Sequence, residues 1–107
     1  LEGLKDYRFC IAMENDHANN YFTEKLLDCM LSGTVPIYHG CKNIQEYFDI
    51  DGIITFNTVD DLVDILNNLT VEDYKSRLSA IQKNYETALT WWEDNDRLFT
   101  KYLKEFV

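Results

Sequence analysis

The chain has 107 residues, of which 46% are hydrophobic, and it carries a formal net charge of −9. This length suits one compact domain that buries roughly two-thirds of the surface its unfolded chain would expose, and the hydrophobic content excludes a disordered chain. Ten Lys and Arg residues against nineteen Asp and Glu residues leave no basic stripe, so the charge argues against binding to nucleic acid or to an anionic membrane surface.

The sequence shows neither a membrane span nor a signal peptide. No stretch approaches eighteen consecutive apolar residues, and no charged and apolar leader opens the chain. The chain starts at Leu1 rather than at Met, which indicates a piece of a longer protein. A targeting segment or membrane association of the parent protein therefore stays open.

The three cysteines are Cys10, Cys29 and Cys41, and their spacing matches no zinc or redox motif. An odd number of cysteines favours free thiols. We therefore expect a reducing compartment such as the cytoplasm.

The first elements predicted are a strand, a loop and a helix. The apolar run over residues 9–13 predicts a strand over residues 7–13. We expect this strand to lie inside a parallel sheet. Turn-forming residues fill the loop over 14–20, and either Asn19 or Asn20 is expected to cap the helix that follows. That helix runs to about Ser32, where Gly33 ends it, and its apolar face consists of Phe22, Leu26, Cys29 and Met30.

Two further strand and helix units follow. A strand over 34–38 contains Pro36, which lacks an N–H and predicts partial pairing or a bulge. Asn43 is expected to cap a short helix that reaches Asp49. A third strand covers 52–56, and Thr58 caps a helix that ends near Leu69. This alternation predicts a parallel sheet with right-handed crossovers, in which ligands bind at the carboxyl ends of the strands.

The chain is helical from Thr70 onward. Thr70 and Asp73 form a weak capping box, and a break is predicted over 93–95, before a last helix over 96–106. One apolar stripe consists of Tyr74, Leu78, Ile81, Tyr85, Ala88 and Trp92. The aromatic load of residues 71–107 exceeds what two helices usually bury, which predicts an exposed apolar patch and self-association. No linker divides the chain, so we expect a single domain over 1–107.

A lysine in the first turn of the helix after residue 20 suggests an anion site. Lys25 opposes the helix dipole there, and a phosphate would satisfy both the lysine and the backbone N–H groups at that end. The alternative is a solvated surface lysine that binds nothing.

Several motifs in order resemble one known family. Glu14-Asn15, five residues, Tyr21-Phe22-Thr23-Glu24-Lys25, a helix and then Gly33 to Gly40 resemble the nucleotide-sugar-binding block of glycosyltransferase family 10, the α-1,3/4-fucosyltransferases. The similarity continues through Asn43 to Phe48 and the strand Gly52 to Phe56, and covers roughly residues 7–69. It implies the Rossmann-like C-terminal half of a GT-B enzyme.

The resemblance also implies a function and a set of residues. The expected donor is a nucleotide sugar, GDP-fucose, and the expected acceptor is a glycan; neither a cofactor nor a metal is expected, and the general base comes from an N-terminal half. Lys25 would face the diphosphate. Glu24 would lie beside the sugar and ribose hydroxyls as the candidate catalytic carboxylate, and Asn15, Tyr21 and Gly40 would contact the donor.

Each of these residues also has a structural interpretation. Glu24 complements the helix dipole, Asn15 can shape an Asx-turn, and Tyr21 can pack onto the helix as a hydrophobic staple. The pair Asp16-His17 departs from the small hydroxyl or amide residues common in relatives. A carboxylate at position 16 could repel a diphosphate.

Other residues carry weaker signals. His17 is expected to be solvent-exposed rather than an acid or base, and His39 to cap or pack rather than to contact a ligand. The triplets at 49–51 and 94–96 match an Asp-x-Asp metal motif by chance, and the acidic pair Asp60-Asp61 is expected to complement a helix dipole. Trp91-Trp92 could form a sugar-stacking platform, but Trp92 continues the apolar stripe, which favours packing.

Two other functions fit the same residues. One is a non-catalytic α/β binding or assembly module that keeps the fold and uses an apolar face as a protein interface. The other is transfer from a different sugar nucleotide, because no motif fixes the base or the sugar.

Overall fold

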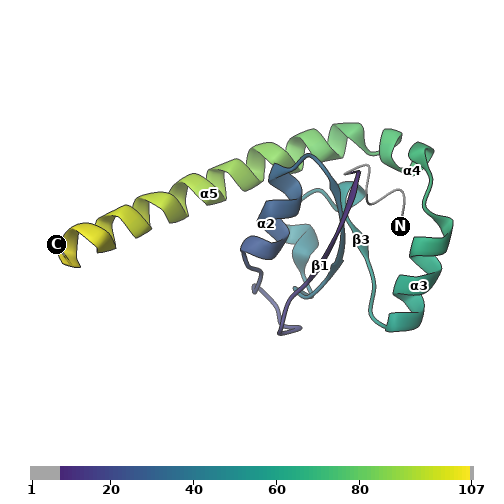
Figure 1. Cartoon of the computed structure of the whole chain (residues 1–107), viewed down its shortest axis with the longest axis horizontal. Helices are drawn as coiled ribbons and strands as arrows, with labels where there is room; N and C mark the ends of the chain where they lie inside the picture. The colour runs from purple at the N-terminus through teal and green to yellow at the C-terminus, as the bar shows by residue number, and fades with distance from the viewer. Residues whose placement is uncertain (1–7, 107) are drawn as a thin grey trace.

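The structure is a computed structural model that describes the backbone of residues 8–106 and the side chains of residues 8–93. Strands β1 (Phe9–Met13), β2 (Val35–His39) and β3 (Ile54–Thr55) form one parallel sheet in that order (Figure 1). The predicted α/β fold with parallel strands is thus confirmed. Because the strands are parallel, the loops that follow β1 and β2 leave from the same edge of the sheet, called here the carboxyl rim.

The helices follow the predicted order with different bounds. They are α2 (Glu24–Leu31), the 3-10 turns η1 (Ile44–Glu46) and η2 (Ile50–Gly52), α3 (Val59–Asn68), α4 (Val71–Lys75) and α5 (Leu78–Phe106). The predicted third strand over 52–56 is shortened because η2 occupies its start. Gly33, with φ of 73°, follows the C-cap of α2 as predicted.

The predicted caps are only partly correct. Thr58 and Thr70 cap α3 and α4 through capping boxes. The N-cap of α2, however, is Thr23, whose side chain accepts from the Lys25 N–H. The prediction of Asn19 or Asn20 was wrong because the loop continues through Tyr21 and Phe22, and the helix begins only after Thr23.

Helices cover both faces of the sheet. On one face, α2 buries Leu26, Leu27 and Met30 against Ala12 and Tyr38, and α5 adds Ala88. On the other face, Phe9, Val35 and Ile37 pack against Leu62, Ile65 and Leu66 of α3. The sheet is therefore the middle layer of three.

Pro36 lies in the central strand, which is only partly paired as predicted: all five residues of β2 pair with β1, but only Ile37 and Tyr38 pair with β3. The register partner of Pro36 on β1 is Cys10, and its side chain is buried. The backbone N–H of Val35 donates to the Arg8 carbonyl on the β1 side. Because backbone N–H groups point alternately to the two sides of a strand, an N–H at position 36 would point toward β3. The β2–β3 pairing begins only at Ile37, so the missing N–H leaves no ladder bond unmade.

The C-terminal segment differs from its predicted form. Helix α5 is continuous through residues 93–95, where we predicted a break, and the chain breaks instead between α4 and α5. Its far end projects from the body of the molecule (Figure 1). The predicted side chains Phe99, Tyr102 and Phe106 lie outside the residues whose side chains the structure describes.

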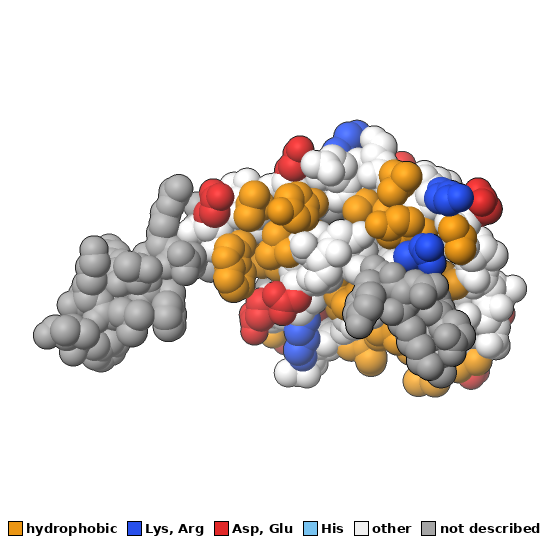
Figure 2. Space-filling model, turned by 45° about the horizontal axis from the view of Figure 1, so that its top comes forward, with side chains coloured by type: hydrophobic (Ala, Val, Ile, Leu, Met, Phe, Trp, Pro, Cys, Tyr) orange, Lys and Arg blue, Asp and Glu red, His pale blue; other side chains and the backbone are white. Residues whose placement is uncertain are grey.

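The buried face of α5 is rotated from the predicted stripe. Ala80, Ile81, Asn84 and Ala88 are buried, whereas Tyr85, Leu89 and Trp92 are exposed. Hydrophobic side chains gather on the described part of α5 and beside it (Figure 2). This confirms the prediction of an exposed apolar patch; self-association stays a prediction.

A disulfide joins Cys10 of β1 to Cys29 of α2, with their Cα atoms 5.7 Å apart. The prediction of free thiols was therefore wrong for these two residues and right for Cys41, which is free and buried. The pairing depends on tertiary structure, because the packing of α2 on β1 brings Cys10 and Cys29 together. Cys41, the third cysteine, is left without a partner for a disulfide. The expected reducing compartment stays a prediction, but it loses the support of three free thiols.

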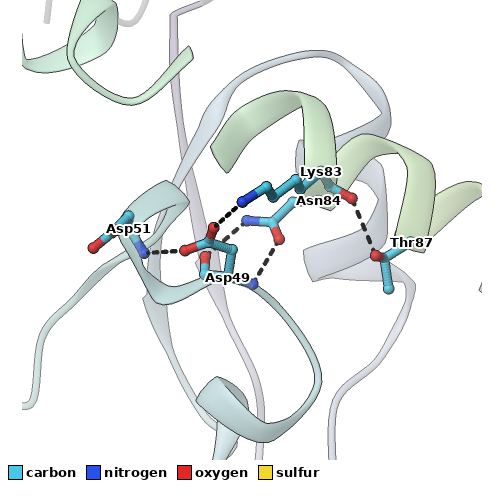
Figure 3. Close-up of polar contacts among 5 residues, drawn as sticks. All are labelled: Asp49, Asp51, Lys83, Asn84 and Thr87. Atoms are coloured by element: carbon cyan, nitrogen blue, oxygen red, sulfur yellow. Dashed lines mark hydrogen bonds and ion pairs between the residues drawn. The ribbon is translucent and has the colours of Figure 1, made fainter. Parts of the chain in front are cut away.

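Asn84 ties α5 to the turn that leads into β3. Its side chain accepts from the Asp49 N–H at 2.8 Å and donates to the Asp49 carbonyl at 3.0 Å (Figure 3). The Asp49 carboxylate in turn accepts from the Asp51 N–H and lies 3.7 Å from the Lys83 ammonium. Asn84 is 2% exposed, so both of its bonds are shielded from water.

The replacement Asn84→Ala is expected to lower the free energy of unfolding by about 2 kcal/mol, because it leaves two backbone groups of Asp49 without their partner. Urea denaturation followed by circular dichroism measures the change. Asn67→Ala is the matched control, since Asn67 is exposed on α3 and makes no side-chain hydrogen bond to another described residue. Equal midpoints for the two variants would show that the contact contributes nothing.

Candidate functional site at the carboxyl rim

The two loops of the carboxyl rim are bonded to each other. The Lys42 N–H donates to the Ala18 carbonyl at 3.1 Å. Asn43 accepts from the Asn20 N–H at 2.7 Å and donates to the Asn20 side chain at 2.9 Å. Asn43 was predicted to cap a short helix, but it makes no cap bond, because its side chain is used to hold the neighbouring loop.

Asn20 adopts the left-handed conformation, with φ of 62°. Asparagine tolerates this conformation better than most residues. The resulting geometry points its side-chain oxygen at two donors, since the Tyr47 hydroxyl also donates to it at 2.5 Å. The loop before α2 is therefore held in one shape.

Glu14 is a buried carboxylate directly after β1, and it is 7% exposed. Its Oε1 accepts from the Thr23 hydroxyl at 2.7 Å, and the same hydroxyl accepts from the Lys25 N–H at 3.3 Å. The other oxygen, Oε2, is buried without a hydrogen-bond partner in the described part of the chain. Glu14 thus fixes the N-terminal turn of α2 to the end of β1.

Gly40 and Tyr38 enclose Glu14. A Cβ added at Gly40 would lie 2.4 Å from Glu14 Cγ and 2.7 Å from the Tyr38 hydroxyl oxygen, so only glycine fits there. That hydroxyl accepts from the Cys41 N–H at 3.1 Å. Burial, helped by the nearby Glu14 carboxylate, raises the pKa of Tyr38 to about 12, so it stays protonated at neutral pH.

The five residues of the predicted donor site lie on or beside this rim. Asn15, Tyr21, Glu24 and Lys25 are exposed, and Gly40 is buried. The Lys25 ammonium donates to the Met13 carbonyl at a long 3.4 Å. The side chains of Asn15, Tyr21 and Glu24 make no hydrogen bond or ion pair to other described residues. They are therefore available to a ligand.

The two histidines meet at the rim. Their rings stack with centroids 4.6 Å apart and planes within 5°, and His39 Nδ1 lies 2.9 Å from the Phe56 carbonyl, to which it donates. His39 therefore caps β3, as its structural interpretation predicted, while His17 is exposed. Both line a cavity of about 320 Å³ that Gly40 and Lys42 also line.

The Asp-x-Asp triplets do not form a metal site in the described residues. Asp49 caps η2 and contacts α5 (Figure 3), and the side chains of the triplet at 94–96 lie outside the described ones. Within residues 8–93, no group of three His, Cys, Asp or Glu side chains could hold a metal ion. Asp61 completes the capping box of Thr58, in line with its predicted place in a helix N-terminal turn.

Sequence reasoning missed several residues of the rim. The burial of Glu14 had no local signal, because a carboxylate among turn residues is usually solvated. The role of Thr23 did have one, since a threonine directly before a helix is a preferred N-cap. Lys42, which is exposed beside the cavity, adds a second cation that we did not single out.

A parallel sheet between helices, with polar loops at its carboxyl edge, is the architecture of α/β proteins that bind a ligand at that edge. The sequence model of "Glycosyltransferase family 10 (fucosyltransferase) C-term" matches residues 1–104. The chain belongs to this family.

Curated relatives agree with that assignment. A fucosyltransferase-like protein of Arabidopsis thaliana is 29% identical over 85% of the chain and 17% of its own length. An α-(1,3)-fucosyltransferase of Helicobacter pylori is 31% identical over 64% of the chain and 15% of its own length. The zebrafish (Danio rerio) GDP-fucose protein O-fucosyltransferase 3 is 41% identical over 41% of the chain and 10% of its own length.

The chain therefore spans less than a fifth of each of these relatives. No solved structure gives a significant match to it. Within the described residues, no helix has the length and apolar character needed to cross a membrane.

Proposed function

We propose that this chain binds the nucleotide-sugar donor of a fucosyltransferase, with GDP-fucose as that donor. The observation that carries the proposal is the first turn of α2. It offers an exposed ammonium at Lys25 and a Glu24 N–H that bonds to no other described residue, next to the end of β1. Helix N–H groups together with a cation favour a phosphate group.

The turn is also held ready for its ligand. The contacts from Glu14 through Thr23 to the Lys25 N–H orient α2 without a ligand, so little ordering is left for the binding step. In this proposal Lys25 faces the diphosphate, and Glu24 accepts hydrogen bonds from sugar or ribose hydroxyls. Asn15 and Tyr21 supply further contacts with side chains that have no other hydrogen-bond partner in the described residues.

The identity of the donor is supported by names of relatives. The zebrafish relative is named for GDP-fucose, and the Helicobacter pylori relative is named as a fucosyltransferase. Lys25 and Lys42 give the rim two exposed cations that can pair with an anionic ligand despite the net charge of −9, although the exposed carboxylates of Asp16 and Glu24 lie in the same region.

In the transfer reaction, this chain would stabilise the leaving group. Negative charge develops on the nucleoside diphosphate as the bond to the sugar breaks, and a fixed cation and helix dipole lower the energy of that charge. The acceptor hydroxyl must also lose a proton to a general base. We propose that an N-terminal half of the enzyme supplies this base and that neither a metal nor a cofactor takes part.

A non-catalytic module with the same fold is the second candidate. The exposed Tyr85, Leu89 and Trp92 on α5 favour it, because such a patch is typical of a protein interface. Sedimentation of the chain decides whether that patch pairs two copies; absence of GDP binding together with dimer formation would favour the module.

The replacement Lys25→Ala tests the donor site. It removes a charge-assisted hydrogen bond to a phosphate, so the dissociation constant for GDP or GDP-fucose is expected to rise about ten- to a hundred-fold. Fold stability should barely change. Calorimetric titration at low salt measures the affinity.

Lys75→Ala is the matched control, because Lys75 is an exposed lysine in the last turn of α4 and its removal changes the net charge equally. It is expected to leave the affinity unchanged. Equal affinities of wild type and Lys25→Ala would show that the phosphate does not bind at the first turn of α2. A wild-type chain that binds no GDP would contradict the proposal for this chain.

A further inference from the structure

The turn between α3 and α4 carries a sequence motif that the proposed function does not use. Asn68-Leu69-Thr70 has the form Asn-x-Ser/Thr without a proline, and no other asparagine of the chain is followed by Ser or Thr two positions later. The asparagine of this motif is the acceptor of N-linked glycans, which attach at the surface of secreted proteins. Because the motif is short, it marks a site only where the fold and the compartment both suit it.

Asn68 is accessible in the folded chain. It is the last residue of α3 and is exposed. Its side-chain nitrogen donates to the Asp64 carbonyl at 2.7 Å and lies 3.4 Å from the Asp64 carboxylate. An amide nitrogen carries two N–H groups, so a sugar can replace one hydrogen while the other N–H keeps the short bond to the carbonyl. The fold therefore accommodates a glycan on Asn68.

The backbone leaves the helical conformation within the motif. Leu69 has φ of −66° and ψ of 137°, and Thr70 has φ of −133° and ψ of 164°, so both residues are extended. The Leu69 side chain packs against the apolar cluster between the sheet and α3, whereas Asn68 and Thr70 are exposed. Leu69 thus anchors the turn, and the acceptor residue faces solvent.

The motif lies at the opposite edge of the sheet from the candidate site. Helix α3 begins shortly after β3, at the carboxyl rim, and runs back for ten residues, which is about 15 Å. The Tyr74 hydroxyl of α4 donates to the carbonyl of Gly33, which precedes β2. Figure 1 shows α3 leading from the end of β3 to α4 at that far edge. A glycan on Asn68 therefore leaves the rim open.

The disulfide between Cys10 and Cys29 is a second, independent observation. Structural disulfides and N-linked glycans are both typical of proteins that pass through an oxidising secretory lumen. The free thiol of Cys41 is buried, and a buried structural cysteine is inert toward oxidation. Together the motif and the disulfide favour an oxidising compartment over the reducing one that we expected from the cysteine count.

We infer that Asn68 carries an N-linked glycan, added in an oxidising secretory lumen. The co-reactant is an oligosaccharide joined through its anomeric carbon to a polyprenyl diphosphate. The Asn68 nitrogen forms a bond to that carbon, the bond from the carbon to the diphosphate oxygen breaks, and the amide loses one proton to a base of the transferase. The polyprenyl diphosphate leaves. This inference does not depend on the donor site.

The order of transfer and folding follows from Thr70. The motif requires its hydroxyl, but in the folded chain this hydroxyl donates to the Asp73 carboxylate and accepts from the Asp73 N–H. Transfer therefore precedes the folding of α4. A variant that folds poorly consequently still reports whether its motif is used.

Secretion of the whole chain tests the inference. A leader peptide directs the chain through the endoplasmic reticulum of a eukaryotic host, and intact mass is measured before and after treatment with peptide-N-glycosidase. Wild type is expected to carry one glycan, whose removal leaves an aspartate at position 68 that peptide mass spectrometry locates. Secreted wild type without a glycan would overturn the inference, and so would an unmodified Asn68 in the parent protein from its own cells.

Four variants isolate the motif. Asn68→Gln keeps a side-chain amide and Thr70→Ala keeps the acceptor, but each breaks the motif, so the glycan is expected to be lost from both. Asn67→Gln is the matched control, because Asn67 is exposed beside the motif and outside it, and Thr70→Ser preserves both the motif and a capping hydroxyl. Both are expected to keep the glycan. Cell extract is analysed with the medium, so a variant retained in the cell is also scored. A glycan that persists on Asn68→Gln would contradict the inference.

Discussion

The double variant Cys10→Ala/Cys29→Ala is expected to have a free energy of unfolding about 3 kcal/mol below that of wild type. The disulfide closes a loop with a sequence separation of 19 residues, and cross-links over loops of about this length stabilise by about 3 kcal/mol through the unfolded chain. That is a large share of the 5–15 kcal/mol typical of whole domains. Urea denaturation of both proteins measures the difference.

Two controls isolate the cross-link. Cys41→Ala removes the free buried thiol, which bonds to Asn43 and to no other described residue, and should cost about 1 kcal/mol. Dithiothreitol should lower the stability of wild type and leave the double variant unchanged. A titration that finds three reactive thiols in unfolded, unreduced wild type, instead of one, would rule the disulfide out.

The disulfide also bears on the candidate site. The segment between Cys10 and Cys29 contains the entire loop after β1 and the first turn of α2. Fixing both ends of this segment limits the conformations of Lys25 relative to β1. Reduction is therefore expected to weaken GDP binding as well as folding, in keeping with the cost of ordering a loop on binding.

The parts of the fold that the sequence predicted are those with local signals. The apolar run before Glu14 predicted β1, the periodicity of Leu26, Cys29 and Met30 predicted the buried face of α2, and Gly33 predicted its end. Thr58 and Thr70 marked their helices because each has an acidic partner three residues later.

The errors arose where tertiary contacts decide. Helix α5 continues through residues 93–95 because polar side chains do not by themselves end a helix, and this segment contains neither Gly nor Pro. Its buried face follows the contact with α2 and η2, so Trp91 meets Phe22 while Trp92 is exposed. Periodicity alone could not choose between two adjacent tryptophans.

The candidate site was predictable in position but not in construction. The resemblance pointed to Lys25 and Glu24 at the carboxyl rim, and both lie there. The hydrogen bond between Glu14 and Thr23 joins residues nine apart in the sequence. Glu14 is enclosed by Tyr38 of β2 and by Gly40, which directly follows β2. Such contacts depend on the packing of β1 against β2, which a single sequence does not specify.

The role of Gly40 gives the second large effect. We expected it to contact the donor, but the structure provides a separate reason for glycine, because an added Cβ would overlap Glu14 Cγ and the Tyr38 hydroxyl. Gly40→Ala is therefore expected to cost about 3 kcal/mol of stability, as overpacking in a closed site does. Gly33→Ala is the control: its φ is 73° but its surroundings are open, so only the backbone penalty of about 1 kcal/mol applies.

A double-mutant cycle separates packing from ligand contact at Gly40. Glu14→Ala removes the Cγ atom that lies 2.4 Å from the added Cβ, so the cost of Gly40→Ala should fall by about 1 kcal/mol or more in that background. If Gly40 served only to let the rim approach a ligand, Gly40→Ala would leave the denaturation midpoint unchanged, show no coupling to Glu14, and weaken GDP binding alone. Coupling together with weaker GDP binding would instead mean that displaced Glu14 acts through Thr23 on the first turn of α2, because that hydroxyl is the contact between them.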